Sequence, residues 1–209
     1  LVGTGKYENK DVAVQAIEAS EAEIVTVAIR RVELDKSLRS EPILNYISPK
    51  KYTILPNTAG CFNAKEAIRI ARLGREILDG KNLLKLEVLK DKETLLPLMD
   101  ETLLAAKELV KDGFEIMVYC TDELEYALKL EEIGCVAIMP LAAPIGSGQG
   151  IVNPDAINSI VEKISQPVII DAGIGTASEV TVAMEMGCDG VLLNTAIAKA
   201  KKPTLMAEA

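Results

Sequence analysis

Short apolar runs alternate with longer amphipathic stretches along nearly the whole chain. Seven runs have the length and residue content of β-strands: IVTVAI, YTILP, LLKLEV, EIMVYC, CVAIMP, PVIIDAG and DGVLLN. The first residues, LVGTG, can form an eighth run. Between the runs, apolar residues recur at helical spacing. We therefore expect helices over 63–78, 94–110, 122–133, 154–164 and 178–186.

This alternation predicts a parallel sheet that helices cover on both faces. Eight strand–helix units in 209 residues favour a closed (β/α)8 barrel, the TIM-barrel fold; an open doubly wound sheet is the alternative and usually has fewer strands. No low-complexity linker interrupts the pattern, so we expect residues 1–209 to form a single barrel domain. The helix after the last run is barely begun at 203–209, and we expect a barrel that is trimmed at both termini.

Composition and charge exclude several classes of partner. The chain is 49% hydrophobic and 26% charged, which is typical of a protein that buries one large core. Its net charge of −8, without a basic stripe, argues against nucleic acid binding. The apolar runs have strand length and the start shows no signal peptide pattern, so we expect no membrane contact and a cytoplasmic protein.

Two residue types limit the chemistry. Histidine is absent, which excludes serine–histidine and cysteine–histidine nucleophile systems and any metal held by imidazole. The four cysteines contain no CxxC spacing, so we expect reduced, mostly buried thiols that serve in packing. We expect neither a metal nor a cofactor, and acid–base chemistry falls to carboxylates, amines, tyrosines or thiols.

The run LLKLEVL at 83–89 carries two charged residues where a buried strand should be apolar. Lys85 and Glu87 are two residues apart and therefore share one face of the strand, while the alternate apolar residues occupy the other. A closed barrel has no exposed edge, so we expect the charged pair to face the lumen. An amine that is desolvated beside a carboxylate suits Schiff-base chemistry on a sugar phosphate. The alternative is an internal salt bridge that only fixes the barrel register.

Glycine-rich segments follow three successive runs, at the end of the sheet where barrels bind their ligands. They are PIGSGQG at 144–150, DAGIGT at 171–176 and NTAIA at 194–198. The second ends at a helix start, whose dipole and free amides favour negative charge. Tight βα turns need glycine for steric reasons alone, but three such loops together indicate a phosphorylated small molecule. Asp171 ends its run as a second acid–base group, or as a helix cap.

Seven motifs, in this order, resemble those of bacterial thiazole synthase of the thiamin pathway: TVAIRR, LPNTAGC, KLEV, YCTDE, MPLAAPIGSGQG, VIIDAGIGT and GVLLNTAIA. The resemblance covers nearly the whole chain. It implies a (β/α)8 barrel enzyme that builds thiazole phosphate carboxylate from 1-deoxy-D-xylulose 5-phosphate, dehydroglycine and sulfur. The sulfur would arrive as a thiocarboxylate on a small ubiquitin-like carrier protein. The resemblance also implies a homo-oligomer.

Site residues follow from the resemblance motif by motif. Lys85 would form an imine with the C2 carbonyl of the ketose, and Glu87 and Asp171 would move protons. The residues that would hold the sugar phosphate are Gly146, Ala172, Gly173, Asn194 and Thr195. Two other functions stay open: another Schiff-base barrel enzyme acting on sugar phosphates, such as an aldolase or isomerase, and a non-catalytic scaffold that binds a phosphate or the carrier.

Overall fold

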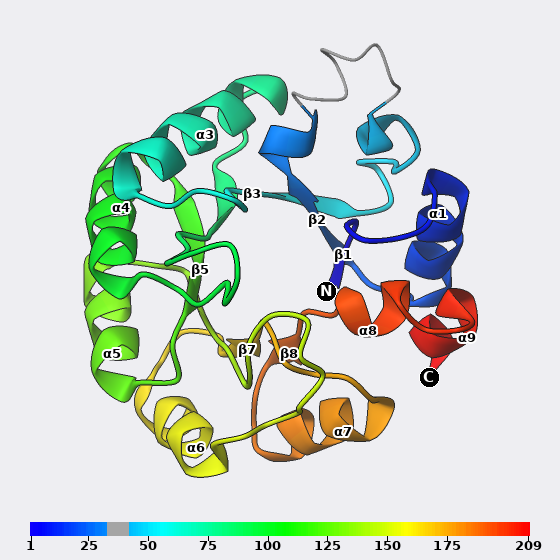
Figure 1. The fold of residues 1–209 in the computed structure, drawn as a ribbon. Helices are drawn as coiled ribbons and strands as arrows, with labels where there is room; N and C mark the ends of the chain where they lie inside the picture. Colours follow the sequence, from blue (N-terminus) through cyan, green and yellow to red (C-terminus); the bar gives the residue numbers. More distant parts are fainter. Residues whose placement is uncertain (33–41) are drawn as a thin grey trace.

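The computed structural model describes residues 1–32 and 42–209, in which parallel strands form a ring inside a layer of helices (Figure 1). The strands are β1 (Val2–Gly3), β2 (Ile24–Ala28), β3 (Thr53–Asn57), β4 (Leu83–Leu86), β5 (Glu115–Cys120), β6 (Ala137–Pro140), β7 (Ile169–Ile170) and β8 (Gly190–Val191). β1 to β6 pair in sequence order, and β7 pairs with β8. Parallel bridges join Ile138 to Val168 and Val2 to Leu193, so the ring is closed. The barrel prediction is confirmed over the open sheet.

Helices follow the strands as the apolar periodicity predicts. They are α1 (Lys10–Ala19), α3 (Ala64–Ile77), α4 (Met99–Lys111), α5 (Leu124–Ile133), α6 (Pro154–Lys163), α7 (Ala177–Glu185), α8 (Thr195–Ala198) and α9 (Pro203–Glu208), with a 3₁₀ turn at Ile43–Asn45. Five of them correspond to the helices that we expected.

The predicted start of one helix is wrong by five residues. The helix expected over 94–110 is α4, which begins at Met99. The preceding segment folds back on itself instead, because the Lys90 amide donates a hydrogen bond to the Leu96 carbonyl at 2.8 Å and Leu98 donates to Val88 at 2.8 Å. We call residues 89–98 the β4 hairpin. Its leucines recur at a spacing that resembles that of a helix, so the sequence predicts a helix. In the structure these leucines line a turn.

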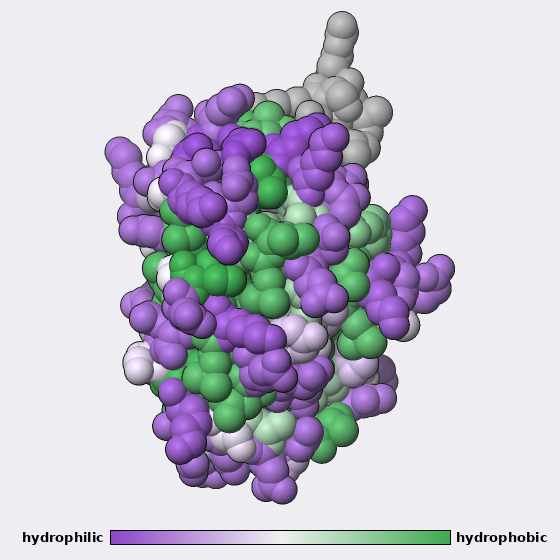
Figure 2. All heavy atoms as spheres, turned by 90° about the vertical axis from the view of Figure 1, so that its left-hand side faces the viewer, coloured by the Kyte–Doolittle hydropathy of each residue, from purple (hydrophilic) through white to green (hydrophobic). Residues whose placement is uncertain are grey.

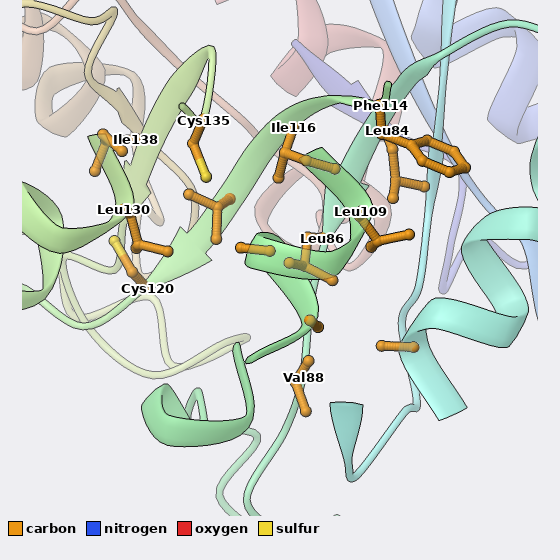
Figure 3. Packing of buried hydrophobic residues seen from close by; sticks show 14 of the residues in the cluster. Leu84, Leu86, Val88, Leu109, Phe114, Ile116, Cys120, Leu130, Cys135 and Ile138 are labelled. Atoms are coloured by element: carbon orange, nitrogen blue, oxygen red, sulfur yellow. The ribbon is translucent and has the colours of Figure 1, made fainter. Parts of the chain in front are cut away.

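The outward face of β4 is part of the main hydrophobic core. Leu84, Leu86 and Val88 are fully buried and pack against α3, α4 and neighbouring strands (Figure 3). Figure 2 shows the outer face of this helix layer, where hydrophilic side chains dominate and hydrophobic ones lie between them. Since alternate residues point to opposite sides, this packing directs Lys85 and Glu87 into the barrel, as predicted.

A second apolar cluster fills the lower part of the lumen, toward the amino ends of the strands. Its buried members come from β3, β5, β6, β7 and the end of β8, and they are Leu55, Met117, Ala137, Met139, Ile169 and Leu192. Polar residues such as Asn57 and Asp171 follow them by two positions on the same inward face. In the described residues, apolar side chains therefore fill the lumen toward the amino ends of the strands, and the cavity lies at the carboxyl ends.

No helix in the described ranges combines the length and the apolar character that a membrane span needs.

Candidate active site

A buried lysine between two carboxylates lies at the centre of the barrel mouth. Lys85 Nζ lies 2.8 Å from Asp171 Oδ2 and 3.2 Å from Glu87 Oε2. All three side chains are buried. Lys85 is on β4, Glu87 follows β4 directly, and Asp171 follows β7 on another side of the ring. The closed barrel thus brings together the three residues that the sequence analysis chose as catalytic.

Thr58 fixes the position of Glu87. Its hydroxyl accepts a hydrogen bond from the Glu87 amide at 2.8 Å and donates one to the Glu87 carbonyl at 2.8 Å. Thr58 itself is fully buried at the end of β3. The backbone that carries Glu87 is therefore held on both sides, and its carboxylate is kept beside Lys85.

Burial and neighbouring charges shift the pKa of Lys85 and of Asp171. Burial lowers the pKa of Lys85, but the negative charges of Asp171 and Glu87 outweigh burial and leave that pKa raised. Burial raises the pKa of Asp171 and the charge of Glu87 adds to this; Lys85 opposes both, and the result is about 6. At neutral pH Lys85 is thus a protonated ammonium, and Asp171 lies close to the pH at which it gains or loses a proton.

An aromatic ring covers the amine from β5. Lys85 Nζ lies 5.4 Å from the centroid of the Tyr119 ring, within the range of a cation–π contact. Tyr119 is fully buried, and its hydroxyl donates a hydrogen bond to the Leu95 carbonyl at 3.3 Å. Tyr119 therefore connects the floor of the site to the β4 hairpin above it.

The three charged groups open into a cavity of about 750 Å³. This volume suits a small molecule. All eight site residues of the sequence analysis line this one cavity: Gly146, Ala172, Gly173, Asn194 and Thr195 together with Lys85, Glu87 and Asp171. These residues are far apart in sequence and follow β4, β6, β7 and β8. The loops after these four strands therefore converge on the cavity.

Steric need explains one of the glycines in full. Gly173 has a φ of +97°, and a Cβ built on it would lie 2.4 Å from the Ala143 nitrogen. The loops after β6 and β7 are in contact there, and the Gly150 amide donates a hydrogen bond to the Gly173 carbonyl at 2.9 Å. The steric reading is therefore confirmed for Gly173, and the close packing of these loops shapes the cavity wall.

The capping of α7 limits which amides near the predicted anion site can meet a ligand. Glu179 Oε2 accepts hydrogen bonds from the two amides just before α7, those of Gly175 at 2.7 Å and Thr176 at 3.1 Å. Thr176 and Glu179 form a capping box, which the helix uses to satisfy its own first turn. These two amides are therefore not available to a ligand.

The sequence analysis missed the loop that follows β1. Gly3, Thr4, Gly5 and Lys6 all line the cavity. LVGTG has the composition of a short strand, but its glycines also lie at the carboxyl end of a barrel strand, which is the signal that the other three loops carry. Arg30 also lines the cavity and forms an ion pair with Glu66.

In the parts of the chain that the structure describes, no group of three or more Cys, Asp or Glu side chains is placed to hold a metal ion.

Comparison with known proteins gives one consistent family. The family model described as "Thiazole biosynthesis protein ThiG" matches residues 1–209. A thiazole synthase of Alkalilimnicola ehrlichii is 59% identical over 209 residues, which cover 100% of this chain and 80% of the relative. A thiazole synthase of Pseudomonas aeruginosa is 58% identical, with 100% and 79% covered.

Solved structures agree with this fold. The crystal structure of the Amycolatopsis orientalis BexX/CysO complex contains a chain that is 33% identical, with a TM-score of 0.87 and coverage of 100% of this chain and 84% of that one. The thiamine phosphate pyrophosphorylase from Pyrococcus furiosus has a TM-score of 0.60 at 17% identity, with 99% and 90% covered, and shares the fold alone.

Proposed function

The chain belongs to the thiazole biosynthesis protein ThiG family, the thiazole synthases, and on that premise we propose that its Lys85 forms an imine with 1-deoxy-D-xylulose 5-phosphate. The observation that carries this proposal is the position of Lys85, which is buried between Glu87 and Asp171 at the floor of a cavity. A purely structural salt bridge would need no cavity and only one carboxylate. Here two carboxylates are available to take and return protons.

Imine formation begins with loss of a proton from the Lys85 ammonium to Asp171, whose carboxylate oxygen lies 2.8 Å away. The free amine then adds to the C2 carbonyl of the ketose. Water leaves from the resulting carbinolamine, with its proton supplied by a carboxylic acid of the pair. A pKa of about 6 lets Asp171 act in both directions near neutral pH.

The imine then directs the following proton transfers. It withdraws electrons from C3, so that a carboxylate can remove the C3 proton, and return of a proton elsewhere shifts the ketone to C3. The sulfur of the carrier's thiocarboxylate adds to that carbon, the C3 oxygen takes over the acyl group, and the carrier leaves as its carboxylate. In the condensation with dehydroglycine, the dehydroglycine nitrogen displaces the Lys85 amine at C2 and its carbon takes the sulfur, and loss of water completes the thiazole ring. The residues Glu87 and Asp171 are the proton carriers within reach of Lys85 in these steps.

The sulfur comes from a partner protein in this proposal. All four cysteines are free and buried, and none lines the cavity among the described residues, so the chain's own thiols are poorly placed as a source. A chain 33% identical to this one was crystallised in a BexX/CysO complex, which supports a protein partner here as well. We assign that partner the chemistry of a ubiquitin-like sulfur carrier.

The remaining expectations stay part of this proposal. Val2 pairs with Leu193 across almost the full length of the chain, which supports a single barrel domain over 1–209. Four unpaired cysteines fit a reducing compartment such as the cytoplasm. We also propose a homo-oligomer, on the family resemblance alone.

Reconstitution tests the function. The purified protein is mixed with 1-deoxy-D-xylulose 5-phosphate, dehydroglycine and the thiocarboxylate form of the carrier, and the product is identified by mass spectrometry. Thiazole phosphate carboxylate should form with the wild type and not with Lys85→Ala. Turnover of the sugar phosphate without the carrier would favour an aldolase or isomerase instead. Carrier binding without turnover would indicate a scaffold.

A further inference from the structure

We propose that Lys6, on the loop 3–6 after β1, binds the phosphate of the substrate and makes the enzyme selective for a phosphorylated ketose. This inference rests on the proposed function and deepens it. It adds a charged residue to a phosphate site that the sequence assigned only to Gly146, Ala172, Gly173, Asn194 and Thr195.

The ammonium of Lys6 lies among those residues. Its Nζ lies 3.2 Å from Thr195 Oγ1 and donates a hydrogen bond to it across 189 residues of sequence. A Cβ built on Gly146 would also lie 3.2 Å from the same Nζ. Lys6 therefore bridges the loops after β6 and β8, and its charge lies where those loops face the cavity.

The loop is shaped to fit against the site. A Cβ on Gly3 would lie 2.8 Å from both Cβ and Cγ of Asn194, so only glycine allows the contact. The Gly3 amide donates a hydrogen bond to the Leu193 carbonyl at 2.9 Å. Lys6 has a φ of +67°, a left-handed conformation that a lysine seldom adopts and that is costly in free energy. Such strain is maintained where the position of a side chain matters, and here it directs the lysine over Thr195.

A phosphate in this cavity needs a cation that is not already paired. Lys85 is held by its two carboxylates, and Arg30 is paired with Glu66. The amides of Gly175 and Thr176, just before α7, donate to Glu179. Lys6 donates its recorded hydrogen bond to a neutral hydroxyl, so its charge is available to an anion. Arg31 and Lys199 also line the cavity, but Lys6 is singled out by its bond to Thr195, one of the residues proposed to hold the sugar phosphate. A charged donor to phosphate is stronger than a neutral one.

A buried hydrogen-bond acceptor on the cavity wall lacks a donor. Asn194 Oδ1 is buried and accepts no hydrogen bond within the described residues, although Asn194 lines the cavity. A buried acceptor of this kind is costly unless a donor reaches it. A hydroxyl of the bound sugar phosphate is such a donor. Lys6 for the phosphate and Asn194 for a neighbouring hydroxyl together fit one ligand.

The test compares Lys6→Met with Lys92→Met, which removes the same charge from the β4 hairpin on the cavity rim. Inorganic phosphate is titrated into each folded variant by calorimetry, and steady-state kinetics are measured with 1-deoxy-D-xylulose 5-phosphate. We expect Lys6→Met to weaken phosphate binding and raise KM by about 10- to 100-fold, with kcat nearly unchanged. Lys6→Arg should restore most of the affinity, and Lys92→Met should resemble the wild type.

Equal effects of Lys6→Met and Lys92→Met on phosphate binding would overturn the proposal, because they would reflect the general charge of the cavity. A fall in kcat at unchanged KM would also overturn it. Phosphate binding is measured without turnover, so failure of the wild type to make thiazole would refute the proposed function and leave the Lys6 result interpretable.

Discussion

Replacing Lys85 by methionine removes the only cation recorded between two buried carboxylates while keeping the length of the side chain. In the described residues Asp171 and Glu87 are each ion-paired with Lys85 alone. The variant must therefore either hold two unpaired buried charges or take up a proton. We expect a stability loss that is large at neutral pH and small in acid.

The magnitude follows from burial and from the pKa of Asp171. Removing one partner of a buried ion pair costs about 3 to 5 kcal/mol of the free energy of unfolding. In the wild type the pKa of Asp171 is raised from 3.8 to about 6, so folding shifts the balance toward the neutral carboxyl by about 3 kcal/mol relative to the unfolded chain. Without Lys85, which lowers this pKa, the value rises further. The loss at neutral pH should thus be about 3 to 5 kcal/mol.

Both proteins should lose stability as pH rises, but over different ranges of pH. A carboxyl whose pKa is raised by folding binds more protons in the folded state, so stability falls as pH increases from its unfolded to its folded pKa. In the wild type this fall is complete slightly above pH 6. In Lys85→Met it continues to the higher pKa of the variant. The difference between the two proteins therefore grows as pH rises above about 6.

Urea unfolding at about pH 5 and about pH 7.5 measures this difference. Lys129→Met is a matched control, because Lys129 pairs with Glu125 at 2.6 Å on the exposed surface of α5. That variant should show little change at either pH. An equal loss at both pH values for Lys85→Met would refute the reasoning, since it would indicate lost packing rather than an unpaired charge.

Three further predictions concern the residues around this group. Leu86→Ala should lower the free energy of unfolding by about 2 to 5 kcal/mol in urea, because Leu86 is fully buried against the helices; a loss under about 1 kcal/mol would contradict that packing. Gly173→Ala should destabilise by more than about 2 kcal/mol and disturb the cavity, because its Cβ would lie 2.4 Å from the Ala143 nitrogen; normal stability in thermal melts would contradict this. Glu87→Gln removes one of the charges that raise the pKa of Lys85, so the pH profile of imine formation should move to lower pH, and a shift to higher pH would count against the electrostatic account.

The sequence was most informative where local spacing determines structure. Alternation along LLKLEVL separated the residues that pack outward, Leu84 and Leu86, from the lysine that points into the lumen. The closure of the sheet followed from the number of strand–helix units. Both conclusions depend on periodicity, which a single segment carries by itself.

What the sequence could not give are contacts between distant segments. The hydrogen bond from Lys6 to Thr195 spans 189 residues, and nothing near either residue indicates it. The amides just before α7 can bond either to Glu179 or to an anion, and the motif DAGIGT is compatible with both. The β4 hairpin has leucines at helical spacing, and only tertiary packing excludes a helix there.

Trapping the imine tests the central claim most directly. The protein is incubated with 1-deoxy-D-xylulose 5-phosphate, reduced with borohydride, digested and analysed by mass spectrometry, with Lys85→Ala treated in parallel. Our account predicts that the reduced sugar phosphate is attached to the peptide containing Lys85 and is absent from the variant. An unmodified Lys85 in folded protein, or the same adduct on another lysine, would contradict it.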